Sequence, residues 1–179
     1  MKLVLDACVL FPTVMRESLL AVAATGLFQP LWSNRILGEW HRAAQRYGTD
    51  ADHDAAAAIT RARAGFPHAT IKPQPGLESR LHLPDENDLH VLAVAIASSA
   101  DAIITLNAKD FPRAILSAEG LDRRDPDSLL WELWSHHPTQ ITAALEQVRT
   151  RASELSGSQK SLAPMLKRAK LTRLARAVA

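Results

Sequence analysis

The chain has 179 residues, of which 47% are hydrophobic and 22% charged, and its formal net charge is +2. These proportions indicate one folded, soluble domain with room for a modest appendage, and they exclude a largely disordered chain. The single cysteine, Cys8, excludes an intramolecular disulfide and a zinc site built on cysteines.

Short apolar runs that alternate with helical patterns predict an α/β fold. The expected strands cover residues 2–5, 28–32, 68–72 and 102–105. The expected helices cover residues 12–26, 33–48, 50–64 and 86–99, with a short helix after Pro112. Strands of four or five residues between longer helices are typical of βαβ units, so we predict a central parallel sheet.

The pattern changes beyond residue 121, where helical periodicity continues without a strand signal. Helices are expected to begin at Asp125-Pro126, at Pro138 and at Pro164, with a break at Gly157. From Leu155 onward there are six basic residues and no acidic residue. Such a tail suits a protein with a nucleic-acid or acidic partner, although a solvated helix explains the charge more simply.

Acidic residues follow the predicted strands. Asp6 comes directly after the first strand, Glu39 lies in the helix after the second, and Asp110 lies in the loop after the fourth. Asp85 and Asp88 stand at the start of the nearly all-apolar helix 86–99. Because a parallel sheet binds ligands outside the carboxyl ends of its strands, these acids are candidates for one site.

Each acid taken singly also has a structural explanation, as a turn former, a helix cap or a partner of the helix dipole. These structural roles do not explain why four such acids would converge on one edge of the sheet. Clustered carboxylates repel one another unless some are protonated or a cation neutralises them. Oxygen ligands without cysteine or paired histidine select Mg²⁺ or Mn²⁺, and phosphodiester hydrolysis is the reaction class that such an ion supports.

Four segments in order carry a resemblance to a known family. They are LVLDACVLF, SNRILGEW, LPDENDLHVLAVAIASSADAIIT and TLNAKDFP, which together span roughly residues 1–120. In this respect the chain resembles PIN-domain ribonucleases, particularly the VapC-type toxins of toxin–antitoxin pairs. The resemblance implies a three-layer fold with a central parallel sheet of about five strands, forming a nuclease domain over residues 1–122. A helical extension over residues 123–179 would follow it.

The resemblance also implies the catalytic residues. The first three acids of the family fall on Asp6, Glu39 and Asp88, and the fourth is assigned to Asp110. Asp6, Asp88 and Asp110 would bind Mg²⁺ or Mn²⁺. Asn107 shares the fourth segment as a polar neighbour of the ligands, and Asp85 is an extra acid found in one branch of the family. Thr105 and Ser33 lie where a hydroxyl could orient a carboxylate or a water.

The implied function is metal-dependent endoribonuclease activity on RNA, with structured RNA such as tRNA or rRNA as the target. The resemblance further implies that the protein is a toxin that a cognate antitoxin silences. We also expect a homodimer and RNA contacts from four residues of the tail, which are Lys167, Lys170, Arg173 and Arg176. The alternative is a non-catalytic or RNA-processing PIN-domain protein that binds RNA or a protein partner. Retention of all four acids argues against a non-catalytic protein.

Other residue patterns exclude competing functions. A haloacid-dehalogenase phosphatase needs an acid where Cys8 stands, and a dinucleotide-binding domain needs glycines that do not occur before Gly26. Cys8 itself is expected to be a small, buried, hydrophobic side chain, because an acidic site does not favour a thiolate. The histidines are expected in exposed loops. Without a signal sequence or an apolar run of about 20 residues, we expect a cytoplasmic protein with no membrane partner.

Overall fold

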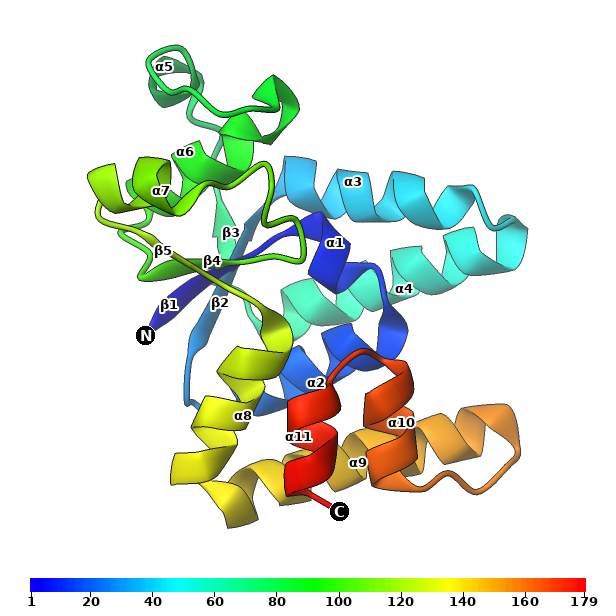
Figure 1. Ribbon diagram of the computed structural model, residues 1–179. Coiled ribbons are helices and arrows are strands. Elements are labelled where there is room, and N and C mark those ends of the chain that lie inside the picture. Colours follow the sequence, from blue (N-terminus) through cyan, green and yellow to red (C-terminus); the bar gives the residue numbers. More distant parts are fainter. The chain divides into compact units, whose positions relative to one another are not determined.

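The computed structural model describes all 179 residues, and it contains a five-stranded parallel sheet with helices around it (Figure 1). The strands are β1 (Lys2–Leu5), β2 (Gln29–Ser33), β3 (Thr70–Ile71), β4 (Ala102–Ile104) and β5 (Asp122–Arg124). Every neighbouring pair is parallel, and the spatial order is β3-β2-β1-β4-β5. The predicted α/β class and parallel sheet are confirmed.

The strand order reverses beside β1. The chain moves from β1 outward to β2 and β3, and then returns to place β4 on the other side of β1. Leu5 is in register with Ile104, so both strands end at the same level, and the backbone N–H of Asp6 donates to the Ile104 carbonyl at 3.1 Å. The residues after β1 and β4 therefore meet at the reversal point, where open α/β sheets bind ligands.

The chain forms two compact units. The sheet unit comprises residues Met1–Phe11 and Gln29–Arg124, and the helical unit comprises Pro12–Phe28 and Asp125–Ala179. Besides the strands, the sheet unit contains α1 (Ala7–Leu10), α3 (Asn34–Gln45), α4 (Thr49–Gly65), α5 (Pro75–Glu78), the 3₁₀ helix η1 (Glu86–Asp88), α6 (Leu89–Ala97) and α7 (Arg113–Ala118).

Helix α6 lies in the core of the sheet unit and packs against β1, β2 and β4. Its sequence, LHVLAVAIA, is apolar on nearly every side, as a helix buried all round requires. The strands it covers are equally apolar, and Leu5, Ile103 and Ile104 are fully buried. This packing fixes the start of α6, and with it Asp88, against the ends of the central strands.

The helical unit contains α2 (Thr13–Ala24), α8 (Pro126–His136), α9 (Pro138–Ser156), α10 (Leu162–Arg168) and α11 (Thr172–Ala177). Helix α2 packs on α8 and α9, α10 packs on α9 and α11, and α11 packs on α8. The carboxylate of Asp127 accepts the backbone N–H groups of Arg173 and Leu174, at 2.8 and 3.0 Å, and so fixes the start of α11 on α8. No helix of the protein is both long enough and apolar enough to cross a bilayer.

The expectation that no strand follows residue 121 is wrong, because residues 122–124 form β5. This strand reads Asp-Arg-Arg and pairs only with β4 at the edge of the sheet. An edge strand can be short and charged, so it carries no apolar run for a sequence pattern to detect. The last expected helix is also divided in two, because Lys170 adopts a positive φ of 63° between α10 and α11.

The predicted domains, 1–122 and 123–179, remain a prediction, and the compact units divide the chain differently. Residues 12–28 belong with the C-terminal helices, and β5 belongs to the sheet unit. The assignment of α2 depends on its contacts with α8 and α9, which follow it by more than a hundred residues. Local periodicity carries no information about such distant partners.

Candidate active site

The ends of β1 and β4 bring Asp6 and Thr105 into contact. Both side chains are buried, with 6% and 3% of their surface exposed. The Thr105 hydroxyl donates to Asp6 Oδ2 at 2.7 Å, and the Asn107 backbone N–H donates to Thr105 Oγ1 at 2.9 Å. The loop after β4 is thus tied to the carboxylate that follows β1, and Thr105 orients an acid as its position predicts.

Cys8 lies at the same place and contributes a further donor. Its Sγ donates to Asp6 Oδ2 at 3.1 Å, lies 3.3 Å from Thr105 Oγ1, and accepts the Leu106 N–H at 3.3 Å. Burial, and then the charge of Asp6, raise the pKa of the Cys8 thiol to about 12. The residue is only half-buried and makes polar contacts, which corrects the expectation of a buried apolar side chain, but it stays a protonated donor and not a nucleophile.

Three carboxylates converge beside this pair. Asp85, Asp88 and Asp110 each offer an oxygen, and these oxygens lie within 4.8 Å of one another. Asp85 precedes η1, Asp88 ends it, and Asp110 lies in the loop after β4. We call these three residues the acid cluster. The structure therefore brings residues from two distant chain segments into one small volume, with oxygen atoms as the available ligands.

Two amides of the same region hold the acid cluster. Asn107 Nδ2 donates to Asp88 Oδ2 at 3.3 Å, which places this side chain beside the cluster, as predicted. Asp85 Oδ1 accepts from both the backbone N–H and the side-chain amide of Asn87, each at 2.9 Å. Asp85 thus caps η1 and also lies in the acid cluster, and its role as a further ligand stays a prediction.

The charges of the other four candidate acids act on Asp88. Its pKa is raised to about 6, chiefly because burial removes water from the carboxylate, and then by the negative charges of its acidic neighbours. These neighbours, in order of effect, are Asp6, Asp85, Asp110 and Glu39. A divalent cation would relieve this repulsion, and a site made only of oxygen ligands suits Mg²⁺ or Mn²⁺. The residues present therefore fit a metal ion.

Glu39 lies beside the acid cluster, not in it. Its Oε1 is 2.9 Å from Nε2 of His90 and 3.4 Å from Nε of Arg35. Arg35 also donates to the backbone carbonyl of Asn87 at 3.2 Å, which links α3 to η1. His90 lies in α6 with 3% of its surface exposed, so the expectation of exposed loop histidines is wrong for this residue.

An arginine that sequence reasoning missed holds the loop after β4. Nη1 of Arg123, in β5, donates to the carbonyls of Ala108 and Phe111, at 2.5 and 2.9 Å. These carbonyls lie on either side of Asp110, and the Phe111 side chain is fully buried. Arg123 therefore fixes the position of Asp110. The contact depends on the pairing of β4 with β5, which the sequence did not reveal.

The remaining predicted residues lie elsewhere. Ser33 Oγ accepts the Ile36 N–H at 3.1 Å and caps α3. The four basic residues of the tail, Lys167, Lys170, Arg173 and Arg176, are exposed on the helical unit. Their part in RNA binding and the roles assigned to the acids stay predictions.

The raised pKa of Asp88 predicts how the stability of the metal-free protein changes with pH. Its pKa is about 6 when folded, against the ordinary 3.8. Between these values the folded protein binds more protons than the unfolded chain, so stability falls as pH rises. Denaturation midpoints measured in EDTA from pH 4 to 7 should decline for the parent and decline less for Asp88→Asn. Equal slopes in both proteins would contradict the shift.

Comparison with known proteins identifies the family of the chain. A family model described as the PIN domain matches residues 2–109, which include β1 to β4 and four of the five acids, and Asp110 lies one residue beyond the match. The match covers more than half of the chain. No curated protein and no solved structure matches it.

Proposed function

Because the chain belongs to the PIN-domain family, whose members are generally metal-dependent nucleases, we propose that it is a Mg²⁺- or Mn²⁺-dependent endoribonuclease. One observation carries the proposal. Oxygen atoms of Asp85, Asp88 and Asp110 lie within 4.8 Å of one another, and burial together with the charges of the other four acids raises the pKa of Asp88. Acids kept together at such a cost in repulsion are typical of a functional site.

In the proposed site, Asp6, Asp88 and Asp110 hold the ion, and Asp85 is a further ligand. When bound there, a divalent ion supplies charge neutralisation on the phosphate and a more acidic water. Thr105 and Cys8 both donate to Oδ2 of Asp6, which leaves Oδ1 free of those two contacts. Glu39, the fourth proposed catalytic acid, adds negative charge at the edge of the cluster.

The direct test is cleavage of bulk RNA by the purified protein. We expect cleavage with Mg²⁺ or Mn²⁺, none with EDTA, and cleavage slower by on the order of 10²–10³-fold with Asp88→Asn in the same buffer. RNA binding without cleavage under any of these conditions would favour the alternative, a non-catalytic PIN-domain protein. Because the proposed site is a hydrolase, the products should also accumulate over many turnovers.

The helical unit offers a surface for the RNA. Five exposed cations lie on α10, on α11 and between them, namely Lys167, Arg168, Lys170, Arg173 and Arg176, and we call them the basic surface. The guanidinium of Arg173 lies 4.1 Å above the ring of the half-buried Trp131. Cations next to an aromatic ring suit contact with phosphates and bases.

Neutralising four of the five cations of the basic surface should weaken RNA binding in a salt-dependent way. We expect the variant Lys167→Gln, Lys170→Gln, Arg173→Gln and Arg176→Gln to bind RNA less tightly in low salt. Each lost phosphate contact should reduce the slope of log affinity against log salt by about 0.7 for single strands. Fluorescence anisotropy at several salt concentrations measures both quantities.

The matched control neutralises four exposed cations of the sheet unit, which are Arg42, Arg46, Arg61 and Lys72. An equal loss of RNA affinity in this control variant would show that only the net charge of the protein matters. Substitution is preferable to deletion of residues 158–179, because Leu166, Leu171 and Leu174 are fully buried and belong to the core of the helical unit.

We further propose that the protein is the toxin of a toxin–antitoxin pair and acts in the cytoplasm, as a homodimer, on structured RNA such as tRNA or rRNA. The support is the resemblance of the four segments to VapC-type toxins. A short neighbouring reading frame that encodes a DNA-binding protein able to block cleavage is the expected finding. A gene without such a neighbour would favour a role in RNA processing.

A further inference from the structure

The structure assigns a positioning role to His90, which holds the carboxylate of Glu39 at the edge of the acid cluster. This inference rests on the proposed nuclease function, because Glu39 is one of its proposed catalytic acids. His90 itself touches no proposed ligand of the ion in a hydrogen bond; it would act through Glu39.

The composition of α6 makes His90 conspicuous. It is the one polar side chain in the helix, whose other residues are leucine, valine, isoleucine and alanine. Only 3% of its surface is exposed. A polar ring buried without a partner costs free energy, and packing alone would be served equally by an apolar side chain of similar size.

The contacts of the ring point to Glu39. Nε2 of His90 lies 2.9 Å from Oε1 of Glu39, which is hydrogen-bond distance, although neither ring nitrogen has a well-aligned hydrogen bond to any group in this arrangement. The Glu39 carboxylate is therefore the group that can satisfy the buried ring. Because the ring is enclosed by the core, it cannot follow Glu39 if that side chain moves, and so it acts as a fixed support.

The second support of Glu39 is weaker. Arg35 Nε lies 3.4 Å from Oε1, and the arginine side chain is 48% exposed and also contacts Glu78 at 3.8 Å. An exposed side chain that divides its contacts between two acids holds neither firmly. The buried histidine is thus the contact that decides where Glu39 lies, and the charge of Glu39 reaches Asp88.

A purely structural histidine and a positioning histidine differ in a double-mutant cycle. We would make His90→Leu and His90→Gln in the parent and in Glu39→Ala. If His90 acts through Glu39, His90→Leu alone should lower kcat by roughly 10–100-fold relative to the parent, because loss of a supporting contact typically costs that much. Added to Glu39→Ala, the same substitution should lower kcat no further. Glutamine, whose Nε2 can donate to the carboxylate, should restore most of the activity.

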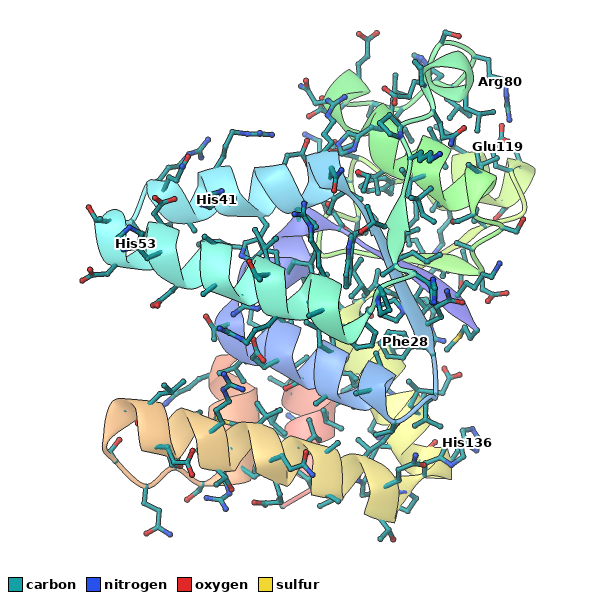
Figure 2. The ribbon with its side chains drawn as sticks, turned by 180° about the vertical axis from the view of Figure 1, so that it is seen from behind. Phe28, His41, His53, Arg80, Glu119 and His136 are labelled. Carbon is teal, nitrogen blue, oxygen red and sulfur yellow. The ribbon has the colours of Figure 1, made fainter.

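A second readout needs no RNA. Mn²⁺ alone should raise the melting temperature of the parent, and His90→Leu should reduce that rise more than His90→Gln does, because a displaced Glu39 no longer adds its charge to the site. The matched control is His41→Leu. His41 also contacts a carboxylate, because its Nε2 lies 2.7 Å from Oδ1 of Asp52, but it lies in the C-terminal half of α3 and its partner lies in α4 (Figure 2).

The outcomes separate the two claims. The positioning role would be overturned if His90→Leu lowered kcat as much in the Glu39→Ala background as in the parent. It would also be overturned if His41→Leu lowered kcat as much as His90→Leu does. So would a glutamine variant no better than leucine in activity and in the Mn²⁺-induced rise. A parent that responds to Mn²⁺ as expected but cuts no RNA would contradict the proposed function and leave the Mn²⁺ comparison as the test of His90. A parent protein that neither responds to Mn²⁺ nor cuts RNA would contradict both the proposed function and the positioning role.

Discussion

Replacing Asp88 by asparagine is expected to abolish most RNA cleavage while making the metal-free protein more stable. Loss of one charge-stabilising group in an active site typically costs on the order of 10²–10³-fold in rate. The stability should rise because the carboxylate is ionised at pH 7 against burial and against four acidic neighbours. Since Asp88 is half-exposed, screening by water limits the gain to about 1 kcal/mol, or about 2–4 °C in a chain of this size.

The opposite signs of these two effects make the test specific. A residue that serves only the fold would lose stability together with activity when it is replaced. Thermal melts in EDTA and cleavage assays with Mg²⁺ measure the two quantities on the same preparation. An asparagine variant that melts below the metal-free parent, or that cleaves RNA at the parent's rate, would contradict the assignment of Asp88.

The second large effect is expected at Asp6, where two substitutions should differ in stability but not in activity. Both Asp6→Asn and Asp6→Ala should lose RNA cleavage by orders of magnitude, because each removes a charged ligand. The asparagine carbonyl can still accept the Thr105 hydroxyl, so the fold should survive unchanged or slightly stabilised. Alanine leaves that buried hydroxyl without its acceptor, which typically costs about 1–3 kcal/mol.

Melting curves of the two variants beside the parent test this expectation. If Asp6 merely closed the turn between β1 and α1, asparagine would serve almost as well as aspartate, and cleavage would persist. Added Mg²⁺ should also raise the melting temperature of the parent more than that of Asp6→Asn, because a ligand stabilises only the state that binds it.

The parts of the site that the sequence predicted are those that local chemistry determines. Asp6 follows an apolar strand, and Asp85 precedes a buried helix, so turn and cap patterns placed them correctly. The topology of a parallel sheet then predicted that residues beyond the strand ends would meet. Asp85, Asp88 and Asp110 do converge, and the charges of Asp6 and Glu39 act on Asp88.

The parts that were missed depend on contacts between distant segments. Arg123 fixes the Asp110 loop only because β5 pairs with β4, and β5 is a charged edge strand without an apolar pattern. His90 was expected at the surface, since a lone histidine gives no sign of the buried Glu39 contact across α3 and α6. The grouping of α2 with the C-terminal helices likewise arises from packing alone.

Direct observation of Mn²⁺ in the acid cluster is the measurement that tests the central claim best. Titration followed by electron paramagnetic resonance distinguishes bound Mn²⁺ from the free ion without any need for RNA. We predict saturable binding to the parent at pH 7, competition by Mg²⁺, weaker binding below pH 6 as Asp88 takes up its proton, and strongly reduced binding to Asp88→Asn. Binding of Mn²⁺ by Asp88→Asn as tightly as by the parent, or no saturable binding by the parent, would contradict the metal site.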